Sequence, residues 1–140
     1  GKGFKTLQYL DENLDFNRYE YTFVGNSPVE FKNIKMKSPM NSIDLSNELK
    51  KHDIFITATE NDTCSNSLLE ALHCGLPVVG LNSGGTPEMI NEGGFVFNGI
   101  DDIIGGIDVV SDNLEKYINN INVKNIEEIG NQYIEFMEKI

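Results

Sequence analysis

The sequence predicts a single α/β domain in which a parallel sheet carries helices on both faces. Three observations lead to this prediction. The chain has 140 residues, which is enough for one domain with a sizeable core. Apolar residues make up 39% and charged residues 24%, as in globular proteins and unlike disordered or fibrous ones. Stretches with strand character alternate with helical periodicity, a pattern typical of parallel sheets with right-handed crossovers.

The first half of the chain begins with a predicted helix. Apolar residues recur at spacings of three and four over 3–14, which indicates one buried helix face. Aromatic and β-branched residues predict a strand over 19–24, and a second, shorter strand is expected over 32–36. A further helix is predicted over 42–51, with Ser42 as its N-cap.

The second half continues the alternation. The apolar run 53–58 is expected to form a central strand buried on both faces. A helix follows over 67–74, with Gly75 in the position of a C-cap. The remaining elements are expected to be a strand over 77–81, a short helix over 86–91, a strand over 94–97, and helices over 101–119 and 123–140.

Charge and cysteine content exclude several classes of protein. The formal net charge is −11 and the sequence pI is about 4.5, so the surface repels nucleic-acid phosphates and no nucleic-acid partner is expected. Cys64 and Cys74 form no CxxC pair or cluster with His, which indicates reduced thiols in a cytoplasmic protein and no metal site. No apolar run approaches the roughly 18 residues of a membrane span.

A polar loop after the 53–58 strand is the candidate site. Small polar residues lead from Ala58 to a helix that starts at Asn66 or Ser67, and the free N–H groups of that helix end could hold a phosphate. Asp62 lies in the loop and Glu70 lies one turn into the helix. Carboxylates repel phosphate but accept hydrogen bonds from hydroxyls, such as those of ribose and a hexose. A diphosphate between two sugars fits this arrangement.

The segment 57–90 resembles the signature region of the glycosyl transferases group 1 family (GT4), which have the two-domain GT-B fold. The family pattern is a carboxylate, seven residues, Glu-Ala-x-x-x-Gly-x-Pro-Val, and then Gly-Gly-x-Pro-Glu. Seven residues separate Asp62 from Glu70, the stretch Glu70–Val79 continues the pattern, and Gly84–Glu88 completes it. The resemblance covers nearly the whole chain and implies the C-terminal, Rossmann-like, nucleotide-sugar-binding half of such an enzyme.

The resemblance also implies roles for particular residues. Glu70 would accept hydrogen bonds from the ribose hydroxyls and Asp62 would contact the transferred sugar near its anomeric carbon, so both are candidate catalytic residues. Lys2 would offset the charge of the leaving diphosphate. The other candidate donor contacts are the backbone N–H groups of Asn66, Ser67 and Leu68, and the glycines Gly25, Gly84 and Gly85. Simpler readings are a solvated Glu70, an N-capping Asp62 and a tight turn at the two adjacent glycines.

Two departures from the family pattern have structural consequences. The family usually has Glu followed by Gly-Phe-Gly where this chain has Asp62 and Thr63–Ser65, so the sugar pocket differs; a register that starts at Glu60 needs nine intervening residues. The family's first strand of this domain, with an Arg at its end, belongs before Lys2 and is absent from the sequence. We therefore expect a gap between the first and third strands, which either closes up or attracts another chain.

By this resemblance, the chain belongs to a retaining hexosyltransferase that transfers a sugar from a nucleoside diphosphate sugar to an acceptor. No metal or cofactor is expected, and the acceptor would bind the N-terminal domain, so the isolated chain is expected to be inactive. The setting would be polysaccharide or cell-envelope glycan synthesis, and peripheral association of the parent enzyme with the inner face of a membrane is compatible with it. The alternatives are a non-catalytic nucleotide-binding half that acts with a partner subunit, and a GT-B sugar-nucleotide epimerase.

Overall fold

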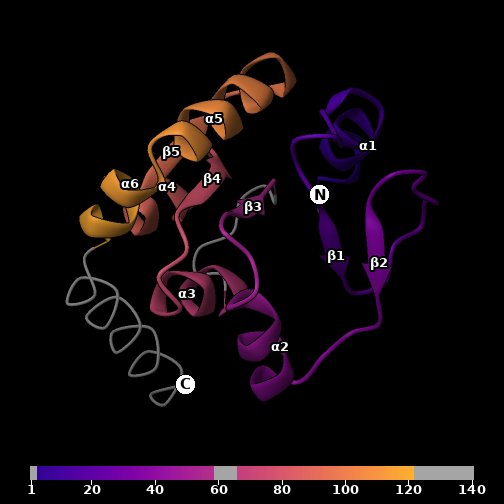
Figure 1. Cartoon of the computed structure of the whole chain (residues 1–140), viewed down its shortest axis with the longest axis horizontal. Coiled ribbons are helices and arrows are strands. Elements are labelled where there is room, and N and C mark those ends of the chain that lie inside the picture. Colours follow the sequence, from indigo (N-terminus) through magenta and orange to yellow (C-terminus); the bar gives the residue numbers. More distant parts are fainter. Residues whose placement is uncertain (1–2, 59–65, 122–140) are drawn as a thin grey trace.

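The computed structural model describes residues 3–58 and 66–121, which form helical layers on both sides of parallel strands (Figure 1). The helices are α1 (Phe4–Asn13), α2 (Ser42–Leu49), α3 (Asn66–His73), α4 (Thr86–Ile90), α5 (Ile100–Asp112) and α6 (Leu114–Asn120). The strands are β1 (Thr22–Val24), β2 (Lys35–Lys37), β3 (Phe55–Thr57), β4 (Val78–Leu81) and β5 (Gly94–Phe97). This architecture confirms the predicted α/β, Rossmann-like fold class.

The strands form two separate parallel sheets, with the orders β1-β2 and β3-β4-β5. In the larger sheet, Val78 of β4 pairs with Phe55 on one side and Gly94 on the other. Figure 1 shows β1 and β2 beside α1, and β3 between them and β4. No ladder joins β1 to β3 within the described ranges. The expected interruption of the sheet is therefore confirmed.

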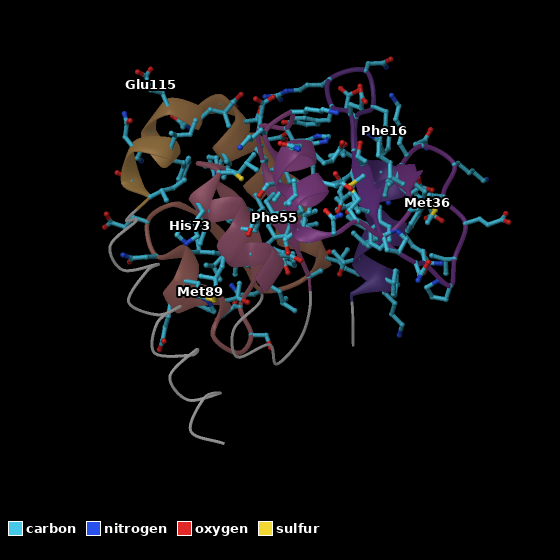
Figure 2. The ribbon with its side chains drawn as sticks, turned by 90° about the horizontal axis from the view of Figure 1, so that it is seen from below. Phe16, Met36, Phe55, His73, Met89 and Glu115 are labelled. Atoms are coloured by element: carbon cyan, nitrogen blue, oxygen red, sulfur yellow. The ribbon has the colours of Figure 1, made fainter. Side chains whose placement is uncertain are left out.

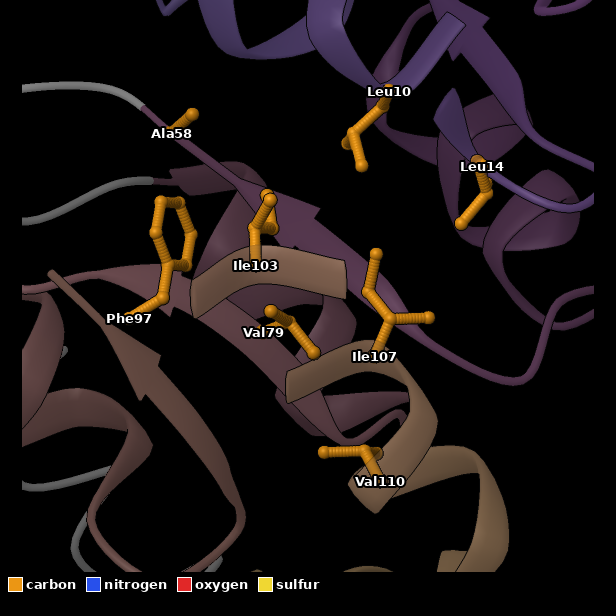
Figure 3. Close-up of a cluster of buried hydrophobic side chains, with 8 residues drawn as sticks. All are labelled: Leu10, Leu14, Ala58, Val79, Phe97, Ile103, Ile107 and Val110. Carbon is orange, nitrogen blue, oxygen red and sulfur yellow. The ribbon is translucent and has the colours of Figure 1, made fainter. Parts of the chain in front are cut away.

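Strand β4 lies at the centre of the hydrophobic packing. Val78 and Val79 have no exposed surface, and because successive side chains of a strand point to opposite faces, they enter different clusters. Val79 packs with α1 and α5 in the cluster of Figure 3, whose buried members are Leu10, Leu14, Ala58, Val79, Phe97, Ile103, Ile107 and Val110. Val78 packs with α3 and α4 in a cluster with Leu68, Leu72, Met89 and Ile90. The two clusters hold helices on both faces of the sheet.

Helix α2 packs on α3 through a third cluster. Its buried members are Leu49, Ala71 and Leu76, and the half-buried Phe55 of β3 contacts both this cluster and the Val78 cluster. Figure 2 shows Phe55 in the middle of the molecule, with Met36 of β2 on one side and His73 of α3 on the other. Phe55 of β3 therefore links helices α2 and α3 to the larger sheet.

Buried Asp11 fixes the segment that precedes β2. Its carboxylate accepts hydrogen bonds from the N–H groups of Lys32, Asn33 and Ile34, at 2.9, 2.8 and 2.9 Å. Burial disfavours the ionised carboxyl, but the three backbone donors outweigh it and hold the pKa of Asp11 below its usual value. The same bonds explain why the second strand begins at Lys35 and not at residue 32, since these N–H groups are occupied by Asp11.

A polar link joins the end of the α1 loop to α5. The Tyr19 hydroxyl donates a hydrogen bond of 2.7 Å to Asp108 Oδ1. The Arg18 guanidinium pairs with Asp112 and lies 3.5 Å from Asp108. These contacts and the α1–α5 packing attach the β1-β2 sheet to the rest of the chain without a sheet hydrogen bond.

Several predicted boundaries change in the structure. The first strand starts at Thr22, three residues later than predicted, because its partner β2 is short. The third strand is half-buried and not fully buried, since one of its edges borders the gap. Asn41, and not Ser42, caps α2 by accepting the Asp44 N–H at 2.8 Å.

The long helix predicted over 101–119 is two helices. Asn113 separates α5 from α6 and leaves helical geometry with φ −132° and ψ 35°. Its side-chain amide donates to the Val109 carbonyl at 2.8 Å, a local bond that competes with the helix. The left-handed φ of +80° at Gly75 fits the predicted C-cap, whereas the helix predicted over 123–140 lies outside the described residues.

Two neighbouring glycines of α5 should respond oppositely to alanine. A Cβ at Gly105 would meet nothing within 4 Å, whereas a Cβ at Gly106 would lie 2.4 Å from Phe95 Cδ1. Gly105→Ala should stabilise the protein by up to about 1 kcal/mol through helix propensity. Gly106→Ala should destabilise it by about 1–3 kcal/mol through overpacking against β5. Urea unfolding of both variants tests this, and equal effects would contradict the packing described for α5.

Candidate functional site

The candidate site lies at the carboxyl ends of the strands, where β3 meets the start of α1. Gly3 precedes α1 with a left-handed φ of +76°, and a Cβ there would lie 2.5 Å from the Ala58 carbonyl oxygen. Only glycine permits this close approach in this conformation. The contact places the first turn of α1 against the end of β3.

A cavity of about 490 Å³ opens at this edge. It is lined by the ends of β3, β4 and β5 and by the first turns of α1 and α5, including Gly3, Phe4, Ala58, Leu81, Asn98 and Gly99. Ligands of open parallel sheets bind at the carboxyl ends of the strands. The first turn of α1 carries no acidic residue, so the partial positive charge of that helix end favours an anion. The first turn of α5 carries Asp101 and Asp102, which offset the charge of the second helix end.

The phosphate cradle is predicted at the first turn of α3. The helix begins at Asn66, as the sequence indicates. Ser67 is exposed in its first turn, whereas the Leu68 side chain is fully buried against α4. Leu68 could therefore contact a ligand only through its backbone. This agrees with the family resemblance, which implies a contact through the Leu68 N–H group.

Glu70 is half-buried on α3 and is held by a residue that sequence reasoning missed. The Ser46 hydroxyl of α2 donates a hydrogen bond to Glu70 Oε1. A carboxylate has about four acceptor positions, so Glu70 keeps acceptors for another donor. The two residues are 24 positions apart, and no local pattern signals their contact, because it depends on the packing of α2 on α3.

The predicted donor glycines occupy two separate turns. Gly84 has a left-handed φ of +57°, and Gly85 is the N-cap of α4. Gly25 follows β1 with φ +135°, and its N–H donates to the Lys37 carbonyl at 3.0 Å. Within the part of the chain that the structure describes, Gly25 and Glu70 share no hydrogen-bond partner. The glycine conformations fit tight turns, and their contact with a donor stays a prediction.

Three predicted site groups lie outside the described residues. These are Lys2, Asp62 and the side chain of Asn66. The alternative carboxylate Glu60 lies there too. Their roles therefore stay predictions from the motif.

Charge around Glu48 secures α2, the helix that carries Ser46. The Glu48 carboxylate is nearly buried and receives Lys37 Nζ of β2 at 2.8 Å. His52 Nε2 lies 3.1 Å away and Lys51 Nζ 3.6 Å away. The hydrogen bonds from Lys37 and His52 lower the pKa of Glu48 to about 2. Glu48 thus links α2 to β2 as an ionised group.

The fold is that of a Rossmann-like α/β domain, and the candidate site lies at the carboxyl ends of its strands. The family model of the glycosyl transferases group 1 matches residues 7–122. The chain therefore belongs to the glycosyl transferases group 1 family. No helix of the described part of the chain is long and apolar enough to cross a membrane.

One curated relative is the sulfoquinovosyl transferase SQD2 of Arabidopsis thaliana. It is 30% identical over 108 residues, which cover 67% of this chain and 21% of the relative. The chain thus spans about a fifth of the length of that protein.

Solved structures share the fold at low identity. Anabaena Alr3699/HepE in complex with UDP-glucose has a TM-score of 0.60 at 16% identity, over 78% of this chain and 33% of that one. The pneumococcal O-GlcNAc transferase GtfA in complex with UDP and GlcNAc has a TM-score of 0.59 at 20% identity, over 76% and 24%. The GtfA/B complex has a TM-score of 0.63 at 14% identity, over 99% and 34%.

The ionised state of Glu48 predicts a loss of stability in acid. Because its folded pKa of about 2 lies below the ordinary value of 4.5, the contribution is present above pH 4.5 and is lost as the pH falls toward 2. Thermal unfolding between pH 7 and pH 2 should show a shallower decline for Glu48→Gln than for the unchanged chain. The exposed Glu115→Gln is the control and should leave the decline unchanged; identical curves for all three proteins would rule out this role of Glu48.

Proposed function

We propose that this chain binds the nucleoside diphosphate sugar donor of a glycosyltransferase of the GT-B type. The observation that carries the proposal is Glu70, a half-buried carboxylate fixed by Ser46 near the first turn of α3. This is the position at which the family motif places the ribose contact. Family membership and the UDP and UDP-glucose named for the similar structures support the same donor class.

Each residue would bind a different part of the nucleoside diphosphate sugar. Glu70 would accept hydrogen bonds from the ribose hydroxyls, and the backbone of Asn66 and Ser67 would hold the diphosphate. Asp62 would contact the transferred sugar, and Lys2 would offset the charge that develops on the leaving diphosphate. The turns at Gly25 and at Gly84-Gly85 would let the backbone approach the donor.

The reaction we propose is transfer of a hexose with retention at the anomeric carbon, without a metal ion. Catalysis would come from stabilisation of the leaving diphosphate and from an acceptor held by a further domain. Residues 1–140 would then be one nucleotide-sugar-binding domain with little activity alone. Synthesis of a polysaccharide or envelope glycan, at the cytoplasmic face of a membrane, is the setting that family analogy suggests.

A second candidate is a nucleotide-binding half that acts with a partner subunit. The similarity to the GtfA/B complex covers 99% of this chain, which favours it. Co-purification with a separate acceptor-binding protein, and activity only in that complex, would support this candidate over a single two-domain enzyme.

Nucleotide binding should depend on the Glu70 carboxylate. Calorimetric titration with UDP, GDP and ADP should show binding of one of them, weakened at least about tenfold in Glu70→Ala, or about 1.4 kcal/mol. Glu70→Gln keeps the shape and should also weaken binding, because the ribose loses a charged acceptor. Glu115→Ala, on the exposed face of α6, is the matched control. Unaltered binding in both Glu70 variants would refute the assigned site.

The Ser46 hydroxyl should position Glu70 for the nucleotide. Ser46→Ala should weaken binding of the same nucleotide by about two- to tenfold, the range expected for one hydrogen bond of about 0.5–1.4 kcal/mol. Ser46→Thr keeps the hydroxyl and should restore most of the affinity. Ser42→Ala, on the exposed start of the same helix, should have no effect. A loss of affinity equal in the Ala and Thr variants would point to packing and not to the hydroxyl.

A further inference from the structure

Lys37, the last residue of β2, makes two contacts in different directions. Its carbonyl accepts the Gly25 N–H at 3.0 Å, which fixes the turn that follows β1. Its ammonium Nζ donates to Glu48 Oε1 of α2 at 2.8 Å. One residue therefore holds both the turn at Gly25 and the helix α2.

The Lys37–Glu48 ion pair differs from its neighbour on the same strand. Lys35 pairs with Glu20, also at 2.8 Å, but these two side chains are 63% and 66% exposed. The Glu48 side chain is 8% exposed. Exposed pairs add little because water and salt screen them, whereas a nearly buried carboxylate that loses a partner is costly. The Lys37–Glu48 pair therefore opposes movement of α2 away from β2.

The remaining partners of Glu48 cannot replace Lys37 in this role. Lys51 and His52 follow α2 directly in the chain, so they move with the helix. Among the described residues that pair with Glu48, Lys37 alone belongs to another element. The position of α2 relative to β2 therefore depends on this one ion pair.

Helix α2 transmits this constraint to the candidate site. Ser46 lies two residues before Glu48, and residues two apart point to nearly opposite sides of a helix. Glu48 faces β2, whereas the Ser46 hydroxyl donates to Glu70 Oε1 of α3. Leu49 packs with Ala71 of α3 in the same interface. Figure 1 shows α2 beside α3, at the end of the segment that leads from β2.

We propose that Lys37 and Glu48 are positioning residues that set the separation of the Gly25 turn and the Glu70 carboxylate, and thereby the affinity for the nucleotide. The proposal rests on the proposed function, in which Gly25 and Glu70 both contact the nucleoside diphosphate sugar. The connection runs from the Gly25 N–H to Lys37, across the ion pair to Glu48, and along α2 to Ser46 and Glu70. Lys37 and Glu48 act through these contacts and do not touch the donor.

A fixed separation raises affinity because the two binding groups are arranged before the ligand arrives. A ligand that bridges two groups binds more tightly when no free energy is spent on ordering them. Without the ion pair, α2 and β2 would sample several separations, and only a fraction of the molecules would be competent to bind. The affinity would then fall although every donor contact is still present.

The first experiment compares two lysines of the same strand. Calorimetric titration uses whichever of UDP, GDP and ADP binds the unchanged chain. Lys37→Met should weaken binding by about two- to tenfold, as for the loss of one hydrogen bond. Lys35→Met makes the same change of charge on β2 and should leave the affinity unchanged. Lys37→Arg keeps the ion pair and should keep most of the affinity.

A double-mutant cycle tests whether Glu48 acts through Ser46. Glu48→Gln alone should weaken binding about as much as Lys37→Met does. In the Ser46→Ala background, the same substitution should weaken binding by less than about twofold, because the connection to Glu70 is already cut.

A further control separates positioning from loss of stability. Tyr19→Phe removes the hydrogen bond to Asp108 that attaches the segment before β1 to α5. It should lower the melting temperature and leave the affinity unchanged, and thermal unfolding shows that each variant is folded at the temperature of the titration. An equal loss of affinity in Tyr19→Phe and Lys37→Met would assign the effect to stability and overturn the proposal.

Four other results would overturn it. Unchanged affinity in Lys37→Met and Glu48→Gln, with Glu70→Ala still weakened, would remove the positioning role and leave the donor site intact. An equal loss in Lys35→Met would assign the effect to net charge. Effects of Glu48→Gln and Ser46→Ala that simply add would show that the two residues act separately. Normal binding in Glu70→Ala would refute the donor site itself, and the positioning role with it.

Discussion

The alternation of side chains along β4 is the constraint on which the larger part of the molecule depends. Val78 and Val79 are both fully buried and belong to different clusters, so one strand holds α3 and α4 on one face and α1 and α5 on the other. The neighbouring strand must come close, since a Cβ at Gly94 would lie 1.9 Å from the Val78 carbonyl oxygen. Only glycine fits there, which makes Gly94 as necessary to the sheet as the valines are.

The smaller sheet is attached by polar contacts as well as by the apolar packing of α1 on α5. Asp11 holds the segment before β2, Glu48 holds the end of β2 to α2, and Arg18 and Tyr19 hold the start of β1 to α5. A buried or nearly buried carboxylate lies at the centre of two of these contacts, and each is ionised because several donors surround it. These contacts add to the apolar packing of Leu10 and Leu14 with the buried side chains of α5.

The sequence was sufficient for the fold class and the order of the elements, because periodicity and turn residues report on local structure. Gly75 and Pro87 marked helix ends that the structure contains. Contacts between distant segments were not accessible in this way. The bonds of Asp11 to residues 21 to 23 positions later shortened the second strand. The bond of Ser46 to Glu70 added a residue to the candidate site that no motif contains. Asn113 broke a helix whose apolar pattern continued, because a single side-chain amide competed with the backbone.

The order of the ladders has a consequence for how the chain acquires its structure. Every strand pairing in the described residues joins strands that are consecutive in the chain, so each pairing closes a comparatively short loop. Contacts of this local kind favour fast folding. During synthesis, α1, β1 and β2 can assemble once residue 37 has emerged, before any part of the larger sheet exists. The two sheets can therefore fold as successive cooperative units, with the α1–α5 contact as the late step that joins them.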